Sequence, residues 1–265
     1  MAASGQTTAG VNGTLWGSRA NDWAELQECQ CLPVYVAALD RLGVGAGTRY
    51  LDAGCGAGGA VRIAADRGAQ VTGFDASETL LAIARQRVPG GVFLQGDLEK
   101  LPFGDGAFDV VTGFNSFQYA GNATGALAEA RRVLKAGGLA AIATWGPPES
   151  MPAAELVAAL RPLLPAPPPG APGPFALSNE ATLRSFAAAA GLDPIEVFDV
   201  ESPFRYSGIE EGVRGLGSSG ISERARKQSG EEAVDSAHRA ALARFLQNDG
   251  SCRVHATFRC LIARA

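Results

Sequence analysis

The chain has 265 residues, of which 46% are hydrophobic and 19% are charged, and its formal net charge at pH 7 is −4. This length and this balance suit one large globular domain, or one domain with a lid. An acidic chain is a poor candidate for binding nucleic-acid phosphates, and no apolar stretch approaches the roughly 18 residues that span a bilayer.

The N-terminal residues are small and polar, so residues 1–13 are predicted to form a flexible tail rather than a secretory signal. A loose apolar face over residues 14–42 then predicts a helical segment that Pro33 interrupts. The five cysteines are odd in number and their spacing fits no zinc pattern, which predicts reduced thiols, a cytoplasmic protein and no metal site.

Residues 48–146 alternate short apolar runs with helical stretches of about ten residues or more. Strands are predicted at 48–54, 69–75, 90–97, 106–115 and 138–145, and helices at 58–68, 76–88 and 122–138. Such alternation indicates βαβ units and an α/β fold, in which helices cover both faces of a parallel sheet. The continuous apolar character of the strands agrees with burial on both faces.

The rhythm changes after Trp145. Residues 146–175 are rich in proline and alanine, which predicts a short helix and a stiff loop whose role at 165–174 stays open. A helix is predicted at 178–192, a strand at 193–204, an insertion with two helices at 207–250, and a final strand at 251–265.

The sequence LDAGCGAGG, residues 51–59, joins the first predicted strand to the first helix. In an open parallel sheet, ligands bind beyond the carboxyl ends of the strands, and glycines let a ligand lie against the backbone. The loop matches both G-x-G-x-x-G and G-x-G-x-G, so by itself it does not separate a dinucleotide from another ribose-containing ligand.

Three acids add to this loop. Asp75 ends the second predicted strand, where a carboxylate accepts hydrogen bonds from ribose hydroxyls, but both kinds of ligand carry a ribose. Asp97 directly follows the third strand, and Asp52 lies two residues before Gly54. Asp52 is suited to a positively charged amino group, which a dinucleotide lacks.

With these features in place, the chain resembles the class I S-adenosylmethionine-dependent methyltransferases, in their broad small-molecule group. The resemblance is carried by LDAGCGAGG, VTGFDAS, GDLEKLPFGDGAFDVVTGFNSFQ and ARRVLKAGGLAAIATW, which together cover most of residues 48–146. It implies a Rossmann-like, doubly wound sheet of seven strands, mostly parallel, with the last strand (252–264) antiparallel. One departure is Ala53, where a branched apolar residue is more usual in the family.

The resemblance also implies a single methyltransferase domain over residues 14–265. Residues 14–47 would form an N-terminal helical cap and 48–146 the cofactor-binding core, while 148–177 and 204–250 would be lid insertions that hold the substrate.

The same resemblance implies cofactor contacts, residue by residue. Asp52 and the loop residues Gly54, Cys55, Gly56 and Gly58 would face the methionine part of S-adenosylmethionine.

Toward the nucleoside, Asp75 would hold the ribose hydroxyls and Ala76 would lie beside the adenine. Asp97 would accept from the adenine amino group, and Leu98 would pack on the ring. Phe114 and Asn115 would line the route to the methyl group.

Methyl transfer by in-line displacement depends mainly on positioning in a closed pocket, so no catalytic side chain is strictly required. Tyr119 and His238 are the candidates for a base. A lone histidine on a helix is more often an exposed residue than a functional one, so His238 is interpreted as a surface residue. His255, in the final strand, is interpreted as a structural histidine. The residues expected to face the substrate are Trp16, Gln118, Tyr119 and Trp145.

Two other functions remain open at this point. One is an NAD-dependent oxidoreductase, and the other is a non-catalytic, cofactor-binding partner subunit. The expected partner is a small molecule, with neither nucleic acid nor membrane, and the protein is expected to be a monomer or a homodimer. The sequence does not indicate the acceptor or whether O-, N- or C-methylation takes place.

Overall fold

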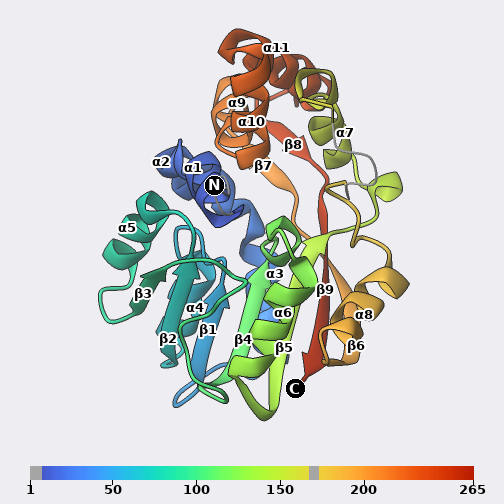
Figure 1. Ribbon diagram of the computed structural model, residues 1–265. Helices are drawn as coiled ribbons and strands as arrows, with labels where there is room; N and C mark the ends of the chain where they lie inside the picture. The colour runs from blue at the N-terminus through green and yellow to red at the C-terminus, as the bar shows by residue number, and fades with distance from the viewer. Residues whose placement is uncertain (1–7, 167–172) are drawn as a thin grey trace, which may run out of the picture.

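The structure, a computed structural model, describes residues 8–166 and 173–265. A seven-stranded sheet with the order β3-β2-β1-β4-β5-β9-β6 runs through the lower part of the molecule (Figure 1). β9 pairs antiparallel with both β5 and β6, and the other pairings are parallel, as predicted. The strands are β1 (Arg49–Ala53), β2 (Gln70–Asp75), β3 (Val92–Gln95), β4 (Phe108–Phe114), β5 (Leu134–Trp145), β6 (Asp193–Glu201) and β9 (Thr257–Arg264).

Helices cover both faces of this sheet. One face packs against α3 (Leu32–Arg41), α4 (Gly59–Asp66) and α5 (Glu78–Arg87), and the other packs against α6 (Ala123–Val133) and α8 (Glu180–Ala189). Alternate strand residues point to opposite faces, so Tyr50 joins the first core and Leu51 joins the second. The strand order reverses between β1 and β4, which places the carboxyl ends of these strands at the usual position of a ligand crevice.

The helix predicted at 122–138 ends five residues early, at Val133. The chain passes directly into β5, because Leu134 already pairs with Phe108 of β4, and a bulge follows before Val110. The glycines at this end of the predicted helix therefore belong to the strand and do not stop the helix.

A smaller cap lies above the carboxyl ends of the central strands (Figure 1). It has its own apolar clusters, which include Leu156, Phe204, Leu216 and Leu242. We use "the cap" for residues 151–164 and 204–254. Its elements are α7 (Ala153–Ala158), β7 (Phe204–Tyr206), α9 (Ile209–Gly217), α10 (Gly220–Ser229), α11 (Glu231–Leu242) and β8 (Cys252–Val254).

The cap differs from the sequence prediction in two ways. The described insertion at 207–250 contains three α-helices instead of two, because Gly230 at φ +87° is the single residue between α10 and α11. The predicted final strand is broken at His255 and Ala256 into β8 and β9. β8 pairs with β7 in the cap, whereas β9 enters the main sheet.

The N-terminal segment also differs from the prediction. Residues 1–7 of the expected tail lie outside the described residues, but residues 8–13 belong to a helix, α1 (Thr8–Gly17). A Cβ on Gly13 would lie 2.3 Å from the carbonyl oxygen of Ala76, so glycine lets α1 lie directly on the loop after β2. Composition cannot reveal this contact, since it depends on a loop more than 60 residues away.

The rest of this segment is helical almost throughout. α2 (Ala20–Asp22) leads into a π-helical turn (Trp23–Gln27), a 3₁₀ turn (Glu28–Cys31) and then α3. Pro33 lies in the first turn of α3, where its missing N–H costs nothing, so it begins a helix rather than interrupting one. Among the described residues, no helix has the length and apolarity that crossing a bilayer requires.

Candidate functional site

A pocket lies between the carboxyl ends of the central strands, the N-terminal helices and the cap. We call the part lined by the loops after β1, β2, β3 and β4 its glycine-loop end, and the part lined by cap residues its cap end. The sequence-predicted residues that line it are Trp16, Gly54, Gly56, Asp75, Ala76, Asp97, Leu98, Phe114, Asn115, Tyr119, Trp145 and His238. Segments far apart in the sequence therefore meet in one place.

The glycine loop has a conformation that other residues rarely adopt. Gly54 has φ +86°, and a Cβ there would lie 2.3 Å from Cβ of Ser116, in the loop after β4. Gly56 has φ +54°. Both positions need glycine because of the backbone angle, and Gly54 needs it also because two loops meet there.

Asp75 holds this loop in place. Its Oδ2 accepts a hydrogen bond from the Gly56 N–H at 2.9 Å, and its Oδ1 accepts from the Ser77 N–H at 2.8 Å. Burial raises the pKa of Asp75, while the amides of Ser77 and Gly56 oppose that rise. Each carboxylate oxygen can accept a further hydrogen bond, and Asp75 lines the pocket.

Four predicted residues are not among those that line the pocket. Asp52 is buried, accepts a hydrogen bond from Thr112 Oγ1 at 2.8 Å, and has a pKa that burial raises to about 7. Cys55 is also buried, and Gly58 precedes α4. Gln118 donates to Asn115 Oδ1 at 2.9 Å.

This bond involves a strained residue. Asn115 has φ +50° and is the one non-glycine residue with positive φ in the described parts of the chain. Gln118 thus supports a pocket residue through its side chain, a role that spacing in the sequence does not reveal.

An aromatic cluster closes the pocket on the side of α1. The ring of Trp16 meets the ring of Trp23 at 5.0 Å and that of Tyr119 at 5.5 Å between centroids. Burial raises the pKa of Tyr119 to about 12, so its phenol stays protonated at neutral pH. The protonated phenol can donate a hydrogen bond, and its role as a base stays a prediction.

Two polar atoms at the glycine-loop end were not singled out from the sequence. Nε1 of Trp23 and Oγ of Ser116 are buried without a hydrogen-bond partner in residues 8–166 and 173–265, and both residues line the pocket. Such atoms are costly in a folded protein, and they often mark places where a ligand completes the hydrogen bonding. The only signal from Trp23 in the sequence is its place on an apolar helix face.

An ion pair between Glu28 and Arg87 contacts the backbone of the glycine loop. Glu28 pairs with Arg87, and it also accepts from the Gly59 N–H at 3.3 Å. Arg87 donates to the carbonyl oxygens of Ala57 at 3.0 Å and Ala24 at 2.6 Å. The pair therefore connects the N-terminal segment, the glycine loop and α5. A lone glutamate in a helical stretch gives no sign of this role.

The two histidines have places opposite to those predicted. His238 is only 2% exposed and lines the cap end of the pocket, so its interpretation as a surface residue was wrong. It becomes buried because α9 and α10 pack over α11. His255, interpreted as structural, is exposed at the break between β8 and β9, 3.5 Å from Thr257 Oγ1.

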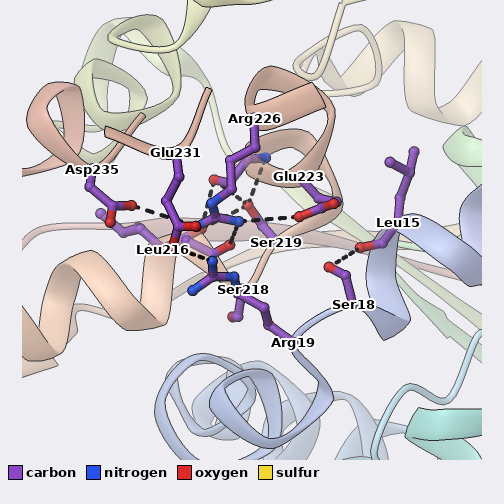
Figure 2. A network of polar contacts seen from close by, with 12 residues as sticks. Leu15, Ser18, Arg19, Leu216, Ser218, Ser219, Glu223, Arg226, Glu231 and Asp235 are labelled. Atoms are coloured by element: carbon purple, nitrogen blue, oxygen red, sulfur yellow. Dashed lines mark hydrogen bonds and ion pairs between the residues drawn. The ribbon is translucent and has the colours of Figure 1, made fainter. Parts of the chain in front are cut away.

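Charged side chains hold the cap helices together beside His238. Figure 2 shows Arg226 of α10 between Glu223 and Asp235, and it shows Glu231 of α11 reaching Arg19. The side chain of Arg226 is only 7% exposed and also donates to the Gly217 carbonyl oxygen at 2.7 Å. The network fixes α10 against α9 and α11, and through Arg19 it reaches the N-terminal segment.

Known proteins resemble this chain mainly in the half that carries the glycine loop. Residues 51–142 match the family described as methyltransferase domain. The malonyl-acyl-carrier protein O-methyltransferase of Serratia marcescens is 38% identical over 106 residues, which are 39% of this chain and 42% of that protein. The demethylmenaquinone methyltransferase of Beutenbergia cavernae is 37% identical over 112 residues, 42% of this chain and 47% of that protein. The matches thus span less than half the length of these relatives.

Solved structures extend the likeness to the fold of most of the chain. A putative methyltransferase from Bacillus halodurans has a TM-score of 0.57 and 16% identity, covering 87% of this chain and 97% of that one. The (4+2)-cyclase SpnF has a TM-score of 0.55 and 24% identity, covering 87% and 79%. Identities this low show the fold alone, and this fold occurs in proteins named for different reactions.

Proposed function

We propose that this chain, which carries a class I S-adenosylmethionine-dependent methyltransferase domain, transfers a methyl group from S-adenosylmethionine to a small-molecule acceptor. The observation that carries the proposal is the glycine-loop end of the pocket. There, a glycine loop held by Asp75, a second acid at Asp97 and two unpartnered polar atoms surround one space.

The residues at this end fit the polar groups of S-adenosylmethionine. Trp23 offers a buried indole N–H to a carboxylate, and Ser116 offers a hydroxyl to the neighbouring amino group. Asp75 and Asp97 are the only charged side chains that line the described pocket, and both are acceptors suited to ribose hydroxyls and to an adenine amine. We propose that residues 48–146 hold this ligand and that segments 148–177 and 204–250 shape the acceptor site.

When bound, S-adenosylmethionine supplies an electrophilic methyl group on a positively charged sulfur. The chain's own contribution is to orient and to exclude water. Phe114 and Asn115 line the wall at the carboxyl end of β4, while Trp16 and the cap cover the pocket from two sides. Aligning two reactants about 3 Å apart accounts for much of the rate enhancement of such a transfer, so the proposal needs no dedicated base.

Parallel calorimetric titrations with S-adenosylmethionine, S-adenosylhomocysteine and NAD test the proposal. We expect micromolar binding of the first two ligands and no signal from NAD. Binding of NAD alone would make the loop a dinucleotide site and the protein an oxidoreductase candidate. Binding of the first two ligands with no labelled methyl transfer across a broad acceptor panel would instead favour a non-catalytic subunit or another reaction on the same fold.

Replacing Trp23 with phenylalanine should weaken binding of S-adenosylhomocysteine about 10-fold. The variant keeps an aromatic ring at this position but loses the indole N–H and its hydrogen bond to a charged group. Titration calorimetry on the folded variant measures this change. Equal affinities in wild type and Trp23→Phe would remove Trp23 from the binding site.

A further inference from the structure

The described residues at the cap end of the pocket are mostly apolar, and none of them is a charged residue. The side chains of Leu156, Leu160, Phe204, Leu216 and Ile221 line it, and no lysine, arginine, aspartate or glutamate of the described cap does. Residues 167–172, which the structure does not describe, contain no charged residue in the sequence. An acceptor that brought a carboxylate or phosphate here would lose its water without gaining a cation, which is strongly unfavourable.

The polar groups at the cap end come from two serines and His238. Nε2 of His238 lies 2.9 Å from Ser222 Oγ, and this hydroxyl lies 2.8 Å from the Leu216 carbonyl oxygen. Ser219 Oγ also lies 2.9 Å from the Leu216 carbonyl oxygen and 2.9 Å from Ser222 Oγ, so two arrangements of the hydroxyl hydrogens satisfy this cluster. In the arrangement in which Ser222 donates to Leu216, the Ser222 oxygen accepts from the ring, the ring hydrogen of His238 lies on Nε2, and Nδ1 is a bare lone pair.

That lone pair is buried and unpartnered. Nδ1 of His238 has no hydrogen-bond partner among the residues that the structure describes, although the residue is only 2% exposed and lines the pocket. Burial, with a smaller effect from Arg226, lowers the pKa of His238 to about 4. The ring is therefore neutral at neutral pH, and it offers an acceptor atom rather than a positive charge.

We infer that the cap end binds an uncharged, largely apolar acceptor through one hydroxyl or N–H hydrogen, which Nδ1 of His238 accepts. The inference rests on the proposed function, because it describes the second substrate of that reaction. In this role His238 determines specificity, since it selects an apolar molecule with a hydrogen-bond donor over one without. A site built to bond a donor discriminates strongly against the analogue that lacks it, because its own buried group is then left unpaired.

Nitrogen NMR of the protein labelled in its histidine rings tests the geometry first. The chain has only two histidines, and exposed His255 serves as the internal reference. We expect His238 to carry its hydrogen on Nε2. A hydrogen on Nδ1 would overturn the inference, because that nitrogen would then be a donor and could not accept.

Binding of matched probes tests the chemistry. With S-adenosylhomocysteine at saturation, calorimetry compares 2-naphthol, its methyl ether and 2-naphthoate, which share a ring system and differ in donor and charge. We expect 2-naphthol to bind about 10-fold more tightly than the ether, with the carboxylate weakest. Equal binding of naphthol and ether, preference for the carboxylate, or binding of none of the three would overturn the inference.

Two variants assign the preference to this residue. His238→Phe should bind the naphthol and the ether equally, and Ser222→Ala, which leaves the ring in place but removes the group that sets its tautomer, should reduce the preference. A full preference retained in His238→Phe would contradict the inference. Affinity for S-adenosylhomocysteine, measured in the same samples, should stay at the wild-type value. If the wild-type protein does not bind S-adenosylhomocysteine, the proposed function fails, and the inference about the cap end is not what has been contradicted.

Discussion

Replacing Asp75 with alanine is expected to weaken binding of S-adenosylmethionine by one to two orders of magnitude. In the proposed complex the carboxylate accepts from ribose hydroxyls, and in the structure it already accepts from the N–H groups of Gly56 and Ser77. Losing charge-assisted hydrogen bonds costs about 1.5–3 kcal/mol, which corresponds to this range of affinity. The substitution also leaves two backbone N–H groups without their acceptor, so the loop should lose order.

Titration calorimetry with S-adenosylhomocysteine measures the loss, and thermal unfolding shows whether each variant remains folded. Asp75→Asn separates the two roles of the side chain, because one oxygen remains while an NH₂ group now faces a backbone N–H. Asp66→Ala, at an exposed carboxylate on α4, is the control and should bind as wild type does. Unchanged affinity in a folded Asp75→Ala protein would show that the ribose is held elsewhere.

Arg87→Met is expected to lower the free energy of unfolding by about 3–5 kcal/mol at pH 7.5, because it leaves the buried carboxylate of Glu28 without its partner. The side chain of Glu28 is only 5% exposed. Urea unfolding at this pH measures the loss. Arg85→Met is the matched control, since its pair with Glu78 is exposed on both sides and should contribute no more than about 1 kcal/mol.

The loss of unfolding free energy in Arg87→Met should increase with pH. Burial raises the pKa of Glu28, and the charge and hydrogen bond of Arg87 oppose that rise, so removing Arg87 raises the pKa further. A carboxyl group whose pKa is higher in the folded state contributes its stability below its unfolded pKa and loses it as pH rises through its folded pKa. The variant should therefore be less impaired at pH 5 than at pH 7.5.

Glu28→Gln combined with Arg87→Met should recover much of the loss at pH 7.5, because no buried charge remains. A penalty for Arg87→Met that is equal at both pH values, and that the double variant does not relieve, would show that the lost bonds to Ala24 and Ala57 dominate instead.

The parts of the fold that follow from short-range patterns could be predicted. Continuous apolar strands that alternate with amphipathic helices define the central sheet, and the glycine loop, Asp75 and Asp97 line a pocket at its carboxyl edge. Each of these features can be recognised from one strand and the loop or helix that directly follows it. The antiparallel direction of the last strand was predicted from the family resemblance, because nothing within residues 252–264 indicates it.

The features that could not be predicted all depend on distant contacts. Trp23 lines the pocket, and Glu28 pairs with Arg87, because the N-terminal segment packs against the glycine loop. His238 became buried only when three cap helices packed together. A single residue, Gly230, separates α10 from α11, too short a break to be distinguished from a glycine inside one helix.

The attachment of the cap to the sheet has a consequence for how such proteins diversify. The chain crosses between sheet and cap at the ends of β5, β6 and β9, and the pairings Trp145 with Phe258 and Glu201 with Thr257 place these crossings next to one another. Segments between fixed, adjacent points can change in length at little entropic cost, because that cost grows only slowly with loop length. The cap can thus change in evolution while the strands of the sheet keep their register, which agrees with a family match confined to residues 51–142.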